Sequence, residues 1–239
     1  MPKFHDLSEY AAAIAPVIGA ATVNVHASAA RDVAELTTTS GLTPGLLSDL
    51  RGTLPLRPLT RRNLAVIHRY GDAADHEPDL RDHLSQGTLT EDADGTLRLS
   101  AKGLTFVHRL YDLHATATDR VWAGDDLPVL AELTGRVLDA AERLPGGALE
   151  LVAPPYEPEW AGPGLLLFNR LAAVRYHRAD AHAAAWQAAG LSAAGIVGLT
   201  DGPLRAAIEA ETNLRAAAPY RTLTAQERET LYDGLLKRV

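Results

Sequence analysis

The most constraining feature of this sequence is a pair of short strand-like segments set between two helical patterns. GTLTEDADGTLRLS, residues 87–100, alternates apolar and polar residues on both sides of Asp94-Gly95, a dipeptide typical of a tight hairpin turn. The segments before and after it, EPDLRDHLSQ and AKGLTFVHRLYDLHATATDRVW, have the spacing of amphipathic helices. A hairpin held between helices predicts a mainly helical fold with a small β element.

The order of helix, hairpin and long helix resembles a winged-helix domain, with the spacing of the MarR-type version, over residues 56 to 122. The alternative is a helical domain with one surface hairpin. A change of character follows at AGDDL, residues 123–127. We therefore expect a mainly α fold with a small β-hairpin wing, in which residues 1–124 form a winged-helix-like N-terminal domain and residues 125–239 a helical C-terminal domain.

Charge opposes DNA binding by the helix and wing that would read DNA in such a domain, because both should be neutral or basic. Between residues 71 and 98 the acidic residues are Asp72, Asp75, Glu77, Asp79, Asp82, Glu91, Asp92 and Asp94, against Arg81 and Arg98. The preceding segment is basic and carries Arg51, Arg57, Arg61, Arg62 and Arg69. It could bind phosphates of DNA or of a small ligand, or it could pair with the acidic segment.

Composition removes several classes of protein. The 239 residues are 46% hydrophobic and carry a net charge of −7, which indicates a folded chain with no general attraction to nucleic acid or anionic lipid. The absence of cysteine excludes disulfides, thiolate catalysis and cysteine zinc sites. There is no signal-like segment, glycine-rich phosphate loop or dinucleotide fingerprint, so we expect a cytoplasmic protein without an organic cofactor.

The first long helical segment begins EYAAAIAPVIGAATVNV, for which Ser8 is a plausible N-cap. Proline and glycine both disfavour a helix interior, so a break near Pro16 or Gly19 is expected. Further along, PPYEPEW reads as a rigid extended connector, whose Tyr156 and Trp160 either pack onto the core or line a pocket.

RYHRADAHAAAW, residues 175–186, concentrates charge in an alanine-rich helical segment bounded by Pro163 and Gly190. At about 100° per residue, Arg175, Arg178 and His182 fall within an arc of roughly 60°. His177 and Asp180 share a second arc on nearly the opposite side. The helix therefore carries two polar clusters.

Two interpretations of these clusters remain open. In the structural one, Asp180 accepts a hydrogen bond from His177, and the arginines reach acids on neighbouring helices. In the chemical one, Arg175 and Arg178 hold a carboxylate or phosphate, and His182 acts as acid or base near neutral pH. A zinc site is disfavoured because the two histidines point apart and no HExxH spacing is present.

RYHRADAHAAAWQAAGL and the downstream LTDGPLRAAIEAETNLRAAAPY resemble the C-terminal half of an actinobacterial helix-turn-helix-like family of unassigned function. The first part of its pattern is matched by Arg175, His177, Arg178, Asp180 and His182, and the second part by Arg205, Glu209, Thr212 and Pro219. Asn213 stands where aspartate is usual. The match covers about 60 residues, and SAAGIVGLTDGP, residues 192–203, is too short for the helix and wing that such proteins place there.

The resemblance implies a polar pocket between helices, with Glu209 and Thr212 facing the charged helix. Glu209 could instead be exposed or pair with Arg205 at i, i+4. The expected protein is a winged-helix type repurposed for small-molecule binding, as an acid/base enzyme of actinobacterial secondary metabolism that acts on an anionic or polar organic substrate. The alternative is a MarR-like, ligand-responsive regulator, dimeric through its terminal helices. The candidate catalytic residues are His182, His177 and Asp180, and the candidate ligand-binding residues are Arg175, Arg178, Glu209, Thr212, Tyr176 and Trp160.

Overall fold

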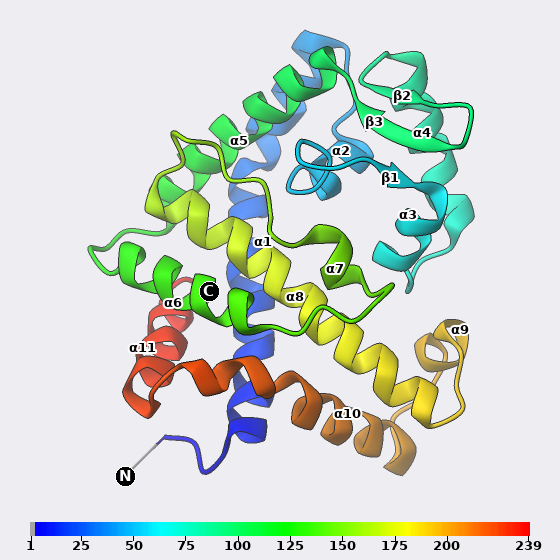
Figure 1. Cartoon of the computed structure of the whole chain (residues 1–239). Helices are drawn as coiled ribbons and strands as arrows, with labels where there is room; N and C mark the ends of the chain where they lie inside the picture. The colour runs from blue at the N-terminus through cyan, green and yellow to red at the C-terminus, as the bar shows by residue number, and fades with distance from the viewer. Residues whose placement is uncertain (1–2) are drawn as a thin grey trace.

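The computed structural model describes residues 3–239 as a mainly helical molecule with one small antiparallel sheet (Figure 1). This confirms the predicted fold class at that level. The helices are α1 (Leu7–Ser40), α2 (Gly45–Leu50), α3 (Arg61–Ile67), α4 (Ala73–Ser85), α5 (Ala101–Val121), α6 (Leu127–Ala140), α7 (Ala148–Val152), α8 (Pro163–Ala188), α9 (Ala193–Val197), α10 (Pro203–Ala216) and α11 (Ala225–Leu236), with a 3₁₀ helix, η1 (Ala218–Thr222). The strands are β1 (Leu59–Thr60), β2 (Leu89–Glu91) and β3 (Thr96–Leu99).

The sheet has the order β1-β3-β2, with α2, α3 and α4 beside it (Figure 1). The predicted hairpin is present, and Gly95 adopts a positive φ of 80° at its turn. Strand β1 was not predicted, because two residues are too short to show a periodic pattern. It places Leu59 opposite Leu97 of β3. The next residue, Thr60, caps α3 through a reciprocal capping box with Asn63.

Helix α1 is continuous from Leu7 to Ser40, so the predicted break near Pro16 or Gly19 is wrong. Asp6, and not Ser8, is its N-cap and accepts a hydrogen bond from the backbone of Glu9 at 2.8 Å. A proline inside a helix costs about 3 kcal/mol. Burial of one apolar face along the whole helix outweighs that cost; its fully buried members include Tyr10, Ile14, Ile18, Ala21 and Val25.

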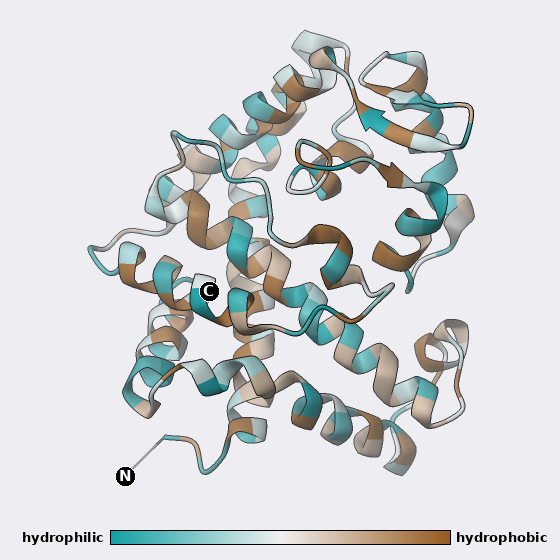
Figure 2. Cartoon of the chain, in the orientation of Figure 1, coloured by the Kyte–Doolittle hydropathy of each residue, from teal (hydrophilic) through white to brown (hydrophobic). Residues whose placement is uncertain are grey.

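One buried apolar cluster continues across the predicted boundary between residues 124 and 125. It joins Leu110 of α5 and Trp122 to Leu130 of α6 and Phe168 of α8. Helix α1 packs against α5, and also against α8, α10 and α11. The two predicted domains therefore share a core. The helices in Figure 2 carry hydrophobic and hydrophilic residues on different parts of each ribbon, as such packing requires.

Helix α1 is also the one helix within residues 3–239 that is long and apolar enough, by length and composition alone, to cross a membrane. Its buried face belongs to the shared core, and the core helix of a soluble protein meets the same criterion.

The connector after α7 runs along α5. The Tyr156 hydroxyl lies 2.8 Å from His108 Nε2, and Tyr111 donates a hydrogen bond to the Tyr156 carbonyl at 3.1 Å. Tyr156 is therefore packed onto the core, whereas Trp160 is 49% exposed.

Candidate functional site

Helix α8 carries the charged motif through the middle of the molecule (Figure 1). Pro163 occupies its first turn, and Gly190, with a φ of 76°, follows its C-terminal end, close to the predicted bounds. It contacts α6, α10, α7, α1 and α5, so much of the helix lies between other elements. The charged side chains are therefore placed between helices, and their roles depend on which neighbour each one meets.

A pocket of about 450 Å³ opens between α1, α8 and α10. It brings together the predicted Arg175, Arg178, His182, Glu209 and Thr212. The rest of the lining is mostly apolar and includes Ala11, Ala15, Pro16, Ile18, Gly19, Val174, Ala216 and Tyr220. Such a combination of an apolar wall with a few convergent polar groups is typical of small-molecule sites.

The two arginines of the pocket differ in their partners. Arg178 donates to Asn213 Oδ1 at 2.8 Å and to Glu209 Oε2 at 3.2 Å, both on α10. Arg175 is exposed and makes no hydrogen bond or ion pair with any residue that the structure describes. Glu209 does not pair with Arg205, because its carboxylate turns across to α8. Arg175 is therefore the cation that remains available to a ligand.

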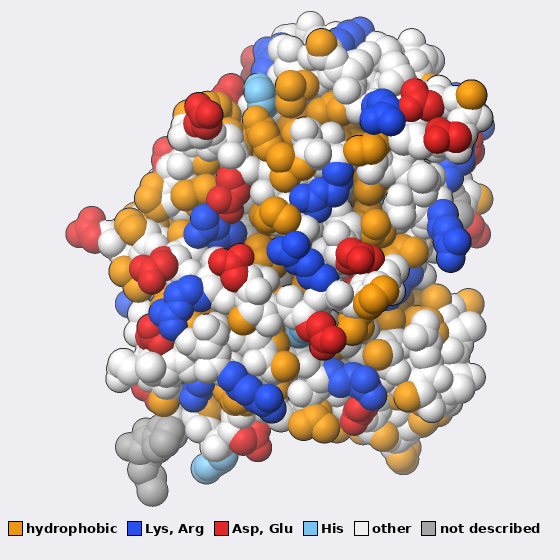
Figure 3. All heavy atoms as spheres, viewed as in Figure 1, with side chains coloured by type: hydrophobic (Ala, Val, Ile, Leu, Met, Phe, Trp, Pro, Cys, Tyr) orange, Lys and Arg blue, Asp and Glu red, His pale blue; other side chains and the backbone are white. Residues whose placement is uncertain are grey.

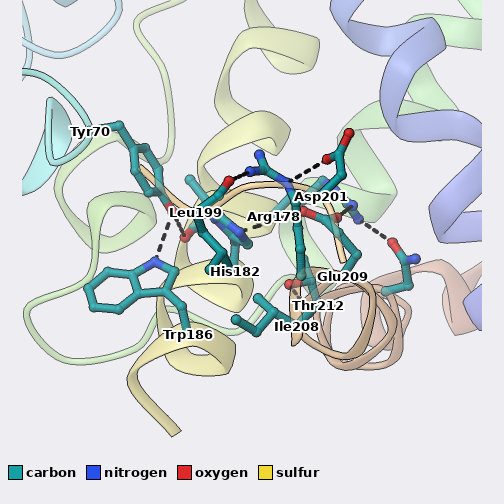
Figure 4. A network of polar contacts seen from close by, with 12 residues as sticks. Tyr70, Arg178, His182, Trp186, Leu199, Asp201, Ile208, Glu209 and Thr212 are labelled. Carbon is teal, nitrogen blue, oxygen red and sulfur yellow. Dashed lines mark hydrogen bonds and ion pairs between the residues drawn. The ribbon is translucent and has the colours of Figure 1, made fainter. Parts of the chain in front are cut away.

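His182 lies between two polar partners (Figure 4). Its Nδ1 is 2.8 Å from the Tyr70 hydroxyl, and its Nε2 is 3.6 Å from Glu209 Oε1. A nearby carboxylate favours the proton on Nε2, which leaves Nδ1 to accept from the tyrosine. Trp186 Nε1 also donates to the Tyr70 oxygen, at 3.4 Å. The imidazole therefore lies between a hydroxyl within hydrogen-bond distance and a carboxylate just beyond it.

Burial sets the ionisation of His182 and Tyr70. It lowers the pKa of His182 below its usual value; Glu209 acts in the opposite direction, and the positive charge of Arg178 lowers the pKa further. Burial likewise raises the pKa of Tyr70. At neutral pH the pocket therefore holds a neutral imidazole and a neutral phenol, a pair suited to accepting and donating a proton.

The opposite side of α8 is closed around the Asp180 carboxylate, beside a second pocket of about 220 Å³ that Asp180 and His177 line. Asp180 is 5% exposed, pairs with Arg69, and accepts hydrogen bonds from the backbones of Ala148 and Leu149 at the start of α7, both at 2.9 Å. The predicted hydrogen bond from His177 to Asp180 is absent among the described contacts, since these donors already occupy the carboxylate. Asp180 thus anchors α7 and the end of the α3 segment to α8.

The other predicted site residues lie in separate surroundings. His177 is buried and lines both this pocket and the second one beside Asp180, and burial lowers its pKa. Thr212 lines the pocket, but its hydroxyl donates to the Ile208 carbonyl at 2.7 Å. Tyr176 lines a different, smaller cavity, and Trp160 lines neither.

Sequence reasoning missed Tyr70 and the wall supplied by α1. Tyr70 is 112 positions from His182 and follows a segment examined only for its arginines, so no local pattern points to it. Pro16 and Gly19 were interpreted as helix breakers, whereas both line the pocket. Small or ring-shaped side chains on a long helix leave room beside it, so Pro16 and Gly19 could have indicated a pocket next to α1.

Most arginines of the predicted basic segment are engaged within the molecule, two of them by carboxylates. Arg57 donates to the main-chain carbonyls of Leu151 and Ala153 at the end of α7, and Arg61 bridges Glu77 at 2.6 Å and Glu91 at 2.8 Å. Arg62 is the member of this segment that has no polar partner in the part of the chain described. Figure 3 shows basic and acidic side chains interspersed on the visible face, without a continuous basic surface.

Within residues 3–239, no group of three or more histidine or acidic side chains is placed to hold a metal ion. No family model, no curated protein and no solved structure matches this chain. The geometry of the pocket is therefore the basis for assigning a role.

Proposed function

We propose that the protein binds a small organic anion in the pocket between α1, α8 and α10. The observation that carries this proposal is Arg175, an unpaired cation on the rim of a 450 Å³ pocket. A guanidinium group binds a carboxylate or phosphate through paired, charge-assisted hydrogen bonds. The volume lies in the range of pockets that hold small organic molecules.

The lining indicates the shape of the ligand. Its anionic group would meet Arg175, and an apolar body would lie against Ala15, Pro16 and Ile18 of α1. A polar group at the other end would reach Tyr70 and His182. A carboxylate with a hydrophobic body and a hydrogen-bonding far end satisfies all three requirements.

Acid–base chemistry on that ligand is part of the proposal. The neutral His182 can accept a proton through Nδ1, either from Tyr70 or from a ligand that displaces it, and Glu209 stabilises the imidazolium that results. Arg175 would hold the anion during transfer, while Arg178 keeps Glu209 in place beside His182. His177 and Asp180, predicted as catalytic, have no place in this scheme because the pocket chemistry does not need them.

The frame of this site resembles a winged helix, which remains a proposal. The order α2, β1, α3, α4, β2, β3 and the pairing of β1 with β3 support it. The same arrangement favours the second candidate function, a MarR-like regulator. Against that function, α4 carries Asp75, Asp79 and Asp82, none of which has an ion-pair partner in the described chain. Negative charge on a reading helix repels DNA.

Binding measured by titration calorimetry tests the first proposal. The probes are aromatic and aliphatic carboxylates of about 10–15 heavy atoms, each compared with its neutral amide. We expect wild-type protein to prefer the carboxylates, and Arg175→Ala to weaken their binding at least tenfold, since charge-assisted hydrogen bonds contribute about 1.5–3 kcal/mol. Arg109→Ala, which removes another exposed arginine on α5, is the matched control. Wild-type affinity in Arg175→Ala would contradict the proposal.

The regulator is tested with labelled DNA from upstream of the gene and a random duplex, from low salt to about 0.2 M. We expect no preference for the upstream fragment. Specific binding that weakens steeply with salt, and that Arg62→Ala reduces, would instead support the regulator, with the pocket as its effector site.

A further inference from the structure

Arg51, at the end of α2, is a buried cation without an acidic partner. It is 5% exposed, and its guanidinium carbon lies 4.8 Å from the centre of the Phe168 ring. One amino group donates to the Ser48 carbonyl, while Nε is buried without any hydrogen-bond partner. No carboxylate lies within ion-pair distance of Arg51 among residues 3–239, and Asp49 acts on it only through its charge.

Leaving such a charge unpaired is costly. Burial of an ion away from water carries a penalty of several kcal/mol unless an opposite charge or several hydrogen bonds compensate it. The surroundings compensate the charge only in part: Asp49, Tyr111 and Tyr176 favour the charged guanidinium, but burial outweighs them and lowers the pKa of Arg51. His26 and His114 supply no counter-charge; burial lowers their pKa values to about 4 and about 2, and the charge of Arg51 lowers both further.

A small cavity of about 40 Å³ adjoins this arginine between α2 and α8. Besides Arg51 it is lined by Thr53, Asn169 and Tyr176, whose hydroxyl and amide groups can donate hydrogen bonds. Thr53 and Asn169 are each 3% exposed, and neither the Thr53 nor the Tyr176 hydroxyl has a partner among the described residues. Space for a single water begins at about 10–15 Å³, so the cavity has room for a small ion and not for an organic molecule.

We propose that this cavity is a binding site for a small inorganic monoanion, of the size of chloride or nitrate, held by Arg51 with hydrogen bonds from Thr53, Tyr176 and Asn169. Asp49 on the exposed rim opposes the anion and favours a monovalent over a divalent one. The site is separate from the larger pocket, whose free cation is Arg175, and does not depend on the function proposed for that pocket.

Thermal unfolding at fixed pH and fixed ionic strength tests this site. Sodium gluconate, whose anion is too large for the cavity, is replaced stepwise by sodium chloride or sodium nitrate. Binding to the folded state alone multiplies the folded-to-unfolded ratio about elevenfold at ten times Kd, which raises Tm by roughly 3–6 °C for a chain of this size. We expect a saturable rise in the wild-type protein and in Arg175→Ala.

Arg51→Met keeps an apolar contact with Phe168 and removes the charge. In this variant the rise should disappear, and Tyr176→Phe, a milder change, should raise the midpoint of the anion dependence severalfold. Equal melting temperatures in chloride and gluconate for wild type would overturn the proposal. So would a saturable rise that persists in Arg51→Met or, should that variant fail to fold, one left unchanged in Tyr176→Phe.

Discussion

The two sides of α8 both carry charged residues, but the charge on one side is buried and paired, whereas a charge on the other side faces a pocket. On one side, Asp180 is buried and meets Arg69 and two backbone N–H groups of α7. On the other, Arg175 faces a pocket with no partner in the described structure. The comparison teaches that the motif alone does not decide between a structural and a chemical role. The neighbouring elements decide it, because α7 brings donors to one side and α1 brings an apolar wall to the other.

The largest expected loss of stability comes from a substitution at Asp180, on the closed side of α8. Asp180→Asn keeps the shape of the side chain but leaves Arg69 without its counter-charge and turns an amide toward backbone donors. Removing one partner of a buried, hydrogen-bonded pair costs about 3–5 kcal/mol, so we expect a loss of that size in urea unfolding. Glu209→Gln, on the open side, should cost less than about 1 kcal/mol. Equal losses in the two variants would remove the distinction.

The next largest loss of stability should come from acid, through protonation of the buried His114. His114 is 1% exposed beneath α8, stacks on Phe168 with ring centres 5.1 Å apart, and has a pKa lowered to about 2 by burial. A histidine whose folded-state pKa is depressed stabilises the fold above about pH 6.5 and loses that contribution as pH falls toward the folded-state value. We expect this residue alone to remove about 2 kcal/mol of stability between pH 7 and pH 5.

The free energy of unfolding measured at several pH values checks this expectation. His114→Phe should flatten the dependence by that amount. An unchanged slope in the variant would show that other histidines carry the acid sensitivity.

The smallest effects come from two glycines that sharpen the comparison. A Cβ at Gly147, beside the closed side, would lie 2.7 Å from Asp180 Oδ2, whereas a Cβ at Gly19, on the pocket wall, would meet nothing within 4 Å. Gly147→Ala should destabilise by about 1–3 kcal/mol through overpacking. Gly19→Ala should stabilise by up to about 1 kcal/mol, because alanine favours a helix interior. Thermal unfolding of the pair checks both signs, and a stabilising Gly147→Ala would contradict the packing.

Local patterns predicted the hairpin, the bounds of α8 and the facing of Arg175, Arg178 and His182, because each depends on residues close together in sequence. They did not predict β1, which is defined only by its pairing with β3. They also missed Tyr70 and misread Pro16, since both belong to the site through contacts with distant segments. The hydrogen bond expected from His177 failed for the same reason: the donors to Asp180 come from α7 and Arg69.

The long helix α1 also has a consequence for synthesis. Its first half is covered by the last helices: Tyr10 donates a hydrogen bond to the carbonyl of Arg228, 218 positions later, and its ring packs on Tyr220. At about 5–20 residues per second, translation takes roughly 10–40 s to supply those partners. During that interval the apolar stripe of α1 is exposed on the nascent chain. Expression at high rates should therefore favour aggregation through this helix, and chaperones that bind apolar segments should engage it first.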